Sequence, residues 1–309
     1  CSSDLKRTQI LGNNKDTVTV MIYMCGSNLE SGYGAASSDI EEMQASGFDS
    51  DRISLLIMAG GSESWRYGFS PDELTINELG RRGVRTVWRG EAASMGAPES
   101  LHALMTYAAS ERPAEKYALI LWDHGGGPLE GVCWDELFSM DQLTLSELTQ
   151  ALADSPLPGK LSWIGFDACL MGSAEVANAL APYAEYMIAS QETEPAAGWN
   201  YSFLNGLEDD SNGAETGRRI VDAYFADKEG TKDVLTLACT DLSRMGDVVA
   251  SMDSFFAPIG QQLNADSFAS ISSRRMSATG FGKSIRGVGE EGYDLVDLGD
   301  LVKEYGGVE

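Results

Sequence analysis

Residues 163–172 read Trp-Ile-Gly-Phe-Asp-Ala-Cys-Leu-Met-Gly. The apolar run at the start predicts a short buried strand, and the small residues after it predict a turn near Cys169. A helix pattern follows over residues 175–180. A thiol at such a junction lies in front of a helix N-terminus, where the helix dipole and free N–H groups lower its pKa. The stretch therefore predicts a reactive cysteine at a strand end.

A second stretch has the same arrangement of strand and turn. Residues 116–122 read Lys-Tyr-Ala-Leu-Ile-Leu-Trp, and Asp-His-Gly-Gly-Gly follows at 123–127. Two parallel strands ending in these turns would bring the imidazole of His124 and the thiol of Cys169 to one edge of a sheet.

Strand and helix patterns alternate along most of the chain. Strands are predicted at residues 17–25, 53–59, 184–190 and 234–239, with a hairpin at 74–79 and 84–88. Helices are predicted at 35–45, 98–109, 145–152, 213–225 and 245–263, and loops at 26–32 and 125–142. This alternation is typical of an α/β fold with a mostly parallel sheet covered by helices on both faces.

The composition excludes some classes of partner. The 309 residues carry a net charge of −25, which argues against nucleic acids and anionic membrane surfaces because their phosphates need Lys and Arg. Cationic substrates remain compatible, although an acidic surface most often serves solubility alone. No apolar run approaches the ~18 residues that a transmembrane helix needs.

The five cysteines form neither a metal site nor a disulfide framework by their spacing. They include no CxxC pair, and only two histidines accompany them, so no metal site is predicted. A single Cys is most often a small buried hydrophobe, and we keep that interpretation for Cys25 and Cys239. Cys133 has no assigned role, and His102 is expected at the surface or in the core.

His124 and Cys169 together favour catalysis. A thiolate nucleophile needs a base nearby and donors for a developing oxyanion. His124 can be the base, and the backbone N–H groups of Gly125 and Cys169 can be the donors. Asp167 either orients the site, contacts a cationic side chain, or bonds its own backbone as a turn residue. A lipase-type oxyanion motif is rejected, because the G-x-S-x-G elbow that it requires is absent from the sequence.

Several motifs together resemble the clostripain family of cysteine peptidases, within the caspase–legumain–gingipain group. They are residues 20–24, 26–31 and 39–43, the His-Gly at 124–125, the nucleophile motif 166–172 and the loop 195–201. The resemblance implies a caspase-like α/β/α sandwich in which Cys169 attacks the scissile carbonyl and His124 protonates the leaving amine. It also implies cleavage of peptides or proteins after Arg or Lys, and in some members self-cleavage and assistance by calcium. No other cofactor is implied.

Two positions differ from the family pattern. Residues 125–159 contain no Lys or Arg, so Lys160 is the one basic residue between His124 and Cys169. Asn200 stands where a pocket acid is expected; with Asp167 it is a predicted substrate-binding residue, and Glu192 and Glu194 lie near enough to substitute. A neutral P1 preference therefore stays open as an alternative. A separate alternative is a catalytically inactive surface lipoprotein that uses the same fold to bind peptides.

The predicted organisation has three parts: a polar tether (1–16), a caspase-like peptidase domain (17–264) and an accessory Ser/Gly-rich segment with a truncated end (265–309). A sequence that begins Cys-Ser-Ser-Asp resembles a bacterial lipoprotein after signal-peptide removal. The competing interpretation is an arbitrary start at a Cys. A lipid on Cys1 is the sole predicted membrane contact, and the predicted location is extracytoplasmic, at the bacterial cell surface or the periplasmic face.

Overall fold

The computed structural model describes residues 16–207, 212–282 and 293–306. The predicted lipid site at Cys1 and nearly all of the predicted tether lie outside these residues. Within them, no helix combines the length and the apolar character needed to cross a membrane.

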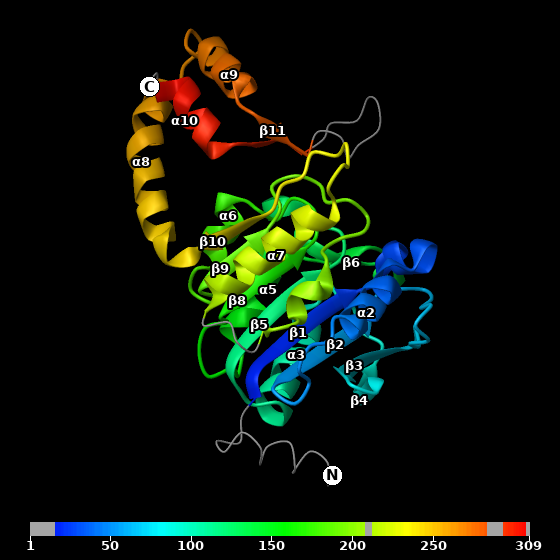
Figure 1. The fold of residues 1–309 in the computed structure, drawn as a ribbon. Helices are drawn as coiled ribbons and strands as arrows, with labels where there is room; N and C mark the ends of the chain where they lie inside the picture. Colours follow the sequence, from blue (N-terminus) through cyan, green and yellow to red (C-terminus); the bar gives the residue numbers. More distant parts are fainter. Residues whose placement is uncertain (1–15, 208–211, 283–292, 307–309) are drawn as a thin grey trace.

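An eight-stranded sheet forms the centre of the fold (Figure 1), in the order β10-β9-β8-β5-β1-β2-β3-β4. Its strands are β1 (Asp16–Cys25), β2 (Ile53–Gly60), β3 (Glu73–Gly80), β4 (Gly83–Glu91), β5 (Ala114–Trp122), β8 (Trp163–Asp167), β9 (Tyr186–Ala189) and β10 (Ala238–Asp241). The five strands from β9 to β2 are parallel. At the edges the pairings are antiparallel: β3 with β2, β4 with β3, and β10 with β9. The parallel strands are continuous apolar runs because both of their faces are buried.

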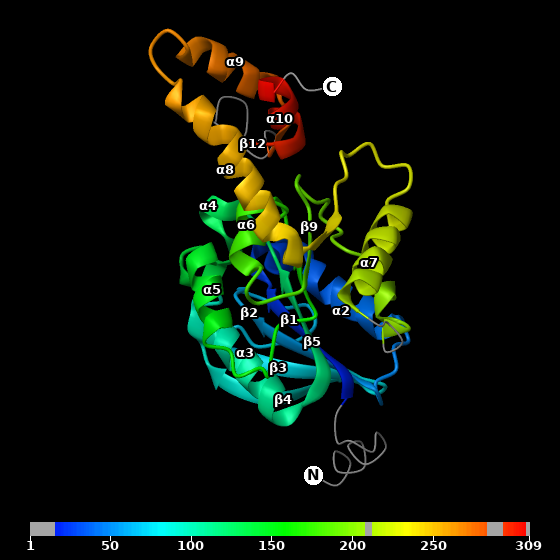
Figure 2. The same cartoon turned by 90° about the vertical axis from the view of Figure 1, so that its left-hand side faces the viewer.

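Helices cover both faces of the sheet, as Figure 2 shows. On one face lie α2 (Ala35–Ala45), α7 (Gly213–Asp227) and the short helix η3 (Tyr201–Leu204); on the other lie α3 (Pro98–Glu111), α5 (Leu145–Ala153) and α6 (Ala174–Leu180). Each face has its own apolar core, one around Ile22 and Ile40 and one around Met21 and Leu104. The predicted α/β/α sandwich is therefore confirmed.

Three local predictions are wrong. The stretch 125–142, predicted as a loop, contains α4 (Gly127–Glu130) and a hairpin of β6 (Val132–Asp135) and β7 (Asp141–Leu143), strands too short for a periodic signal. Residues 26–32 contain a π-helical turn, η1 (Leu29–Tyr33). The strand predicted from residue 234 begins only at Ala238, and Val234 is 69% exposed.

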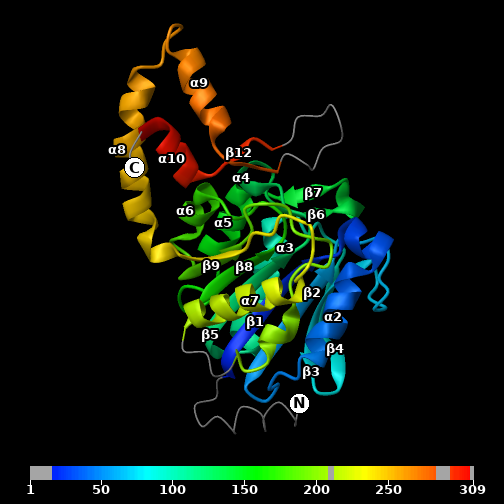
Figure 3. The same cartoon turned by 45° about the horizontal axis from the view of Figure 1, so that its top comes forward.

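The C-terminal part extends from the sandwich and then returns to it. It comprises α8 (Met245–Gln261), α9 (Phe268–Ser277), α10 (Leu298–Gly306) and the short pair β11 (Gly280–Phe281) and β12 (Leu295–Val296). Figure 3 shows β12 close to α4 at the upper end of the sheet. The start of α8 packs near α6, and the ring of Phe256 on α8 contacts Tyr305 on α10. The boundary at residue 264 stays a prediction.

Candidate active site

Two neighbouring parallel strands bring His124 and Cys169 to the same edge of the sheet. Trp122 at the end of β5 pairs with Asp167 at the end of β8, so the turns that follow start side by side. Both His124 and Cys169 line one cavity of about 320 Å³. His124 and Cys169 therefore lie together at the carboxyl edge of the sheet, as the sequence predicts.

Asp123 fixes the turn that carries His124. Its buried carboxyl accepts hydrogen bonds from the Ser27 hydroxyl and from the Trp134 backbone N–H, each at 2.5 Å. These contacts join the end of β1 and the strand β6 to the turn after β5. Burial raises the pKa of Asp123 to about 8, although its hydrogen bonds act in the opposite direction.

The imidazole of His124 is held by a residue that sequence reasoning did not assign to the site. Its Nε2 lies 2.7 Å from Oδ1 of Asn28. Because a carbonyl oxygen only accepts, Nε2 carries the proton and Nδ1 is the basic nitrogen. Asn28 follows β1, which adjoins β5 in the sheet; a polar residue after an adjacent strand was the one available signal. Burial lowers the pKa of His124.

The environment of Cys169 differs from the prediction of a helix-activated thiol. Burial, and to a smaller extent the charges of nearby acids, raise the pKa of its thiol to about 11, although the Glu194 N–H, 3.3 Å from Sγ, acts in the opposite direction. The N-terminus of the expected helix is not next to the thiol, because α6 begins only at Ala174. The Val176 N–H at that end already donates to the Ser173 hydroxyl. The prediction of a lowered pKa is therefore wrong for the resting protein.

The two predicted oxyanion donors lie in turns that touch. A Cβ at Gly125 would come within 2.2 Å of the Cys169 carbonyl oxygen, so only glycine allows this approach. Within the described residues, neither the Gly125 N–H nor the Cys169 N–H donates a hydrogen bond. Both donors are therefore available to a ligand.

Two acids, Asp167 and Glu194, form an acidic wall of the same cavity. Asp167 is buried; its Oδ1 accepts from the Trp199 N–H at 3.0 Å and its Oδ2 from the Tyr201 hydroxyl at 2.8 Å. Glu194 lines the same cavity. Burial raises the pKa of Asp167 to about 6, and burial together with the charge of Asp167 raises the pKa of Glu194 well above its usual range. Lys228 donates a hydrogen bond to the Gly198 carbonyl.

Asn200 does not line this cavity, contrary to the prediction. Its side-chain oxygen accepts from the Ser202 N–H and caps η3, and its amide nitrogen lies 3.3 Å from Asp227. The amide is used locally because Asn at this position satisfies the free N–H groups of a helix start. Glu192 also turns away, since its Oε1 accepts from the Gly282 N–H at 3.0 Å.

Comparisons with known proteins identify the family of this chain. The model of the clostripain family matches residues 22–306. The chain belongs to the clostripain family. It is 29% identical over 229 residues to clostripain of Hathewaya histolytica, covering 61% of this chain and 41% of that protein, so it spans about two fifths of that relative's length.

Solved structures of the family share the fold. An inactive zymogen C11 protease from Parabacteroides distasonis has a TM-score of 0.67 at 20% identity, over 94% of this chain and 78% of its own. A secreted C11 cysteine protease from Bacteroides thetaiotaomicron, in complex with an irreversible peptide inhibitor, has a TM-score of 0.64 at 20% identity, over 78% of this chain and 71% of its own. At these identities the likeness shows the caspase-like fold alone.

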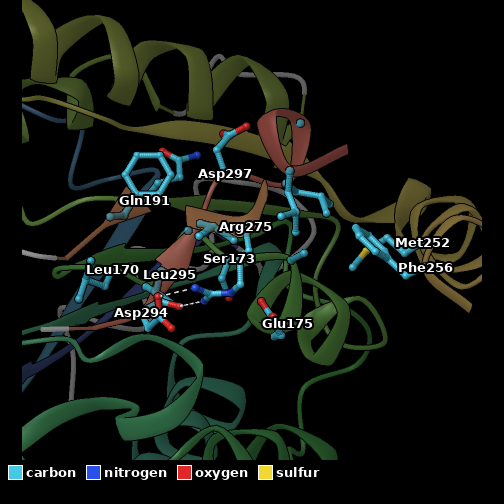
Figure 4. Close-up of a pocket in the computed structure, with 17 residues that line it drawn as sticks. Leu170, Ser173, Glu175, Gln191, Met252, Phe256, Arg275, Asp294, Leu295 and Asp297 are labelled. Carbon is cyan, nitrogen blue, oxygen red and sulfur yellow. Dashed lines mark hydrogen bonds and ion pairs between the residues drawn. The ribbon is translucent and has the colours of Figure 1, made fainter. Parts of the chain in front are cut away.

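A larger cavity of about 550 Å³ lies between the α/β/α sandwich and the C-terminal part (Figure 4). It holds the ion pair of Arg275 with Asp294, and Met252 and Phe256 of α8 line one side. Neither His124 nor Cys169 lines it. The chemistry of the clostripain-family chain is therefore better placed in the smaller cavity.

The other cysteines among the described residues are packed within the fold. Cys25 and Cys133 are buried, and Cys239 on β10 packs against Gly217 of α7. In the part of the chain that the structure describes, no three His, Cys, Asp or Glu side chains are grouped as a metal site would require.

Proposed function

We propose that this clostripain-family chain is a cysteine endopeptidase in which Cys169 is the nucleophile and His124 the general base and acid. The observation that carries the proposal is the single cavity lined by an imidazole and a thiol, at the carboxyl ends of two adjacent parallel strands. The family membership supports the same chemistry.

The proposed reaction starts from two neutral groups. Burial raises the pKa of Cys169 and lowers that of His124, so neither group is charged at pH 7 in the resting protein. When a peptide binds, Nδ1 of His124 takes the thiol proton and Sγ attacks the scissile carbonyl. The Gly125 and Cys169 N–H groups hold the oxyanion. His124 then protonates the leaving amine, and water hydrolyses the resulting thioester.

We further propose that the acidic wall selects Arg or Lys at P1. Asp167 has the lower pKa of the two wall acids and carries the charge above about pH 6, while Glu194 keeps its proton. Lys228 is committed to the Gly198 carbonyl and to Asp227, so Asp167 can pair with a substrate cation. The alternative is a neutral P1 residue. Asn200 does not support it, because the Asn200 amide does not line the cavity.

Peptides that differ only at P1 test both statements. Cys169→Ala should lose at least about 1,000-fold in activity without a change in fold. Asp167→Asn should lose about 30-fold or more on Arg and Lys substrates, because removing one partner of a buried charge pair costs ~2 kcal/mol or more. Asn200→Ser, at a position away from the cavity, keeps a side-chain oxygen that can cap η3; it is the control and should change nothing. Equal turnover of Arg, Lys, Gln and Leu substrates would contradict the P1 preference.

We also propose that the chain does not cleave itself within residues 125–159, which lack Lys and Arg. Lys160, the next basic residue along the chain, is exposed, and its ammonium is bound to the Ala181 carbonyl at 2.6 Å. Intact-mass analysis of wild type beside Cys169→Ala tests this. A cut inside 125–159 that occurs in wild type alone would refute the proposal.

For location, we propose an extracytoplasmic protein. Support comes from structural neighbours that are described as secreted. Cell fractionation tests this, and recovery of the protein from the cytoplasm would contradict it. The remaining alternative, an inactive peptide-binding lipoprotein, predicts that a substrate-like thiol-reactive probe fails to label Cys169 in the native protein.

A further inference from the structure

Four buried side-chain atoms have no hydrogen-bond partner within the described residues. They are Trp65 Nε1, Trp134 Nε1, Glu194 Oε2 and the Tyr224 hydroxyl. A buried polar group without a partner costs about 1–3 kcal/mol, and native proteins contain few. Trp134 and Glu194 both line the catalytic cavity, whereas none of the four lines the larger cavity of Figure 4. The carboxyl of Glu194 also interacts with that of Asp167 through a hydrogen bond, so the indole nitrogen of Trp134 is the cavity atom whose partner a ligand would supply.

The indole of Trp134 is held against the catalytic imidazole. Its backbone N–H is bound to Asp123, the residue before His124. The rings of Trp134 and His124 have centroids 5.8 Å apart at 40°. The indole nitrogen can only donate, so its missing partner is an acceptor such as a carbonyl oxygen.

Because Trp134 lies beside His124, its position decides which part of a substrate can supply that acceptor. The acidic wall of Asp167 and Glu194 is the proposed site of the P1 side chain. His124 must face the leaving amine to protonate it, so its side of the cavity faces the residues that follow the scissile bond. Trp134 lies on that side.

A second aromatic residue closes the same side from the C-terminal part of the chain. Tyr293 lines the catalytic cavity, and its hydroxyl is hydrogen-bonded to Glu130 of α4. The hydroxyl also lies 3.0 Å from where a Cβ on Gly126 would be. Trp134 and Tyr293 thus bound the space next to the turn that carries His124.

We propose that Trp134 is a specificity-determining residue for the leaving-group side of the substrate, where its Nε1 donates to a main-chain carbonyl beyond the scissile bond. The preferred substrate class is then an extended polypeptide rather than an amide with a small leaving group. The inference rests on the proposed peptidase activity.

Two substrates with the same residues before the scissile bond test the proposal. One is a peptidyl aminomethylcoumarin, which has no residue after that bond; the other is an internally quenched peptide with four such residues. Trp134→Phe keeps an aromatic ring and removes the donor, so kcat/KM on the long peptide should fall about 5- to 10-fold more than kcat/KM on the coumarin amide. Trp65→Phe removes the other unpartnered indole N–H, outside the cavity, and should affect neither substrate.

The outcomes separate this inference from the proposed activity. Turnover of the coumarin amide by wild type and its loss in Cys169→Ala test the peptidase proposal alone. An unchanged rate of Trp134→Phe on the long peptide would overturn the role of Trp134. An equal loss on both substrates would also overturn it, because that result would mean that Trp134 only supports the His124 ring and does not contact the leaving-group side of the substrate. If Trp134→Phe melts far below wild type, Tyr293→Ala provides the second measurement and must also affect the long peptide selectively.

Discussion

The hydrogen bond between Asn28 and His124 leads to a quantitative prediction. Asn28→Ala removes the acceptor that lies 2.7 Å from Nε2. During the reaction the imidazole becomes charged, and a hydrogen bond to a charged group contributes about 1.5–3 kcal/mol. That range corresponds to a loss of roughly 10- to 160-fold. Because Asn28 is exposed, water competes for the ring nitrogen, and we expect about tenfold, toward the lower limit of the range.

The substitution Asn28→Asp tests whether the acceptor at position 28 orients the His124 ring or only contacts it. A carboxylate can still accept from Nε2, so the ring should keep its tautomer, and its charge should raise the pKa of His124. The limb of the kcat profile that reports deprotonation of His124 should then move to higher pH. Asn28→Ala should lower kcat without that shift.

The assay is kcat and kcat/KM on a peptidyl aminomethylcoumarin from pH 5 to 9, with thermal unfolding of each variant. Asn200→Ala is the matched control, because that amide caps η3 away from the cavity. Asn28→Ala with activity within twofold of wild type would refute the orienting role. A large loss of thermal stability in the same variant would instead indicate a structural role for Asn28.

Four further results are expected. Gly125→Ala should lose activity severely, because its Cβ would lie 2.2 Å from a carbonyl oxygen, whereas Gly159→Ala meets nothing within 4 Å and should be neutral; similar activities would contradict this. Asp123 keeps its proton in the folded state up to about pH 8 but loses it near pH 4 when unfolded, so folding binds a proton between these values and stability falls as pH rises. The unfolding free energy of wild type minus that of Asp123→Asn should therefore decrease by about 1.4 kcal/mol per unit from pH 5 to 7; a constant difference in urea titrations would contradict it. Below about pH 6 Asp167 takes up a proton, so kcat/KM should fall more for an Arg substrate than for a Leu substrate; parallel profiles would exclude its charge from recognition. Cys133→Ser should stay active although less stable, since it places a hydroxyl in a buried site; an inactive but folded variant would give Cys133 a role.

Local sequence patterns were sufficient to predict most strands of the sheet and to place His124 and Cys169 at strand ends. The helix from Ala35 to Ala45 has the same bounds in the sequence and in the structure. The strands ending at Trp122 and at Asp167 are buried apolar runs whose length and composition reveal them directly. His124 and Cys169 could be placed together because parallel strands present their carboxyl ends at one edge of a sheet.

Other features depended on packing between segments that are distant along the chain. The hairpin of β6 and β7 consists of strands of four and three residues, which have too few positions for a period to emerge. The raised pKa of Cys169 depends on burial and neighbouring acids, whereas the sequence shows only a strand end before a helix. Asn200 was expected at the pocket, but its place in a helix cap became clear only from the path of the loop.

The sequence by itself determined the strand and helix pattern, and with it the edge of the sheet at which His124 and Cys169 meet, because those features follow from the order of apolar and small residues. Only the tertiary structure decided which partners surround them. Asn28 lies 96 residues from His124 along the chain, and Tyr293 lies 163 residues from the Glu130 carboxylate that it binds. Such pairings arise from strand order and loop paths, which bring together residues that no local pattern connects.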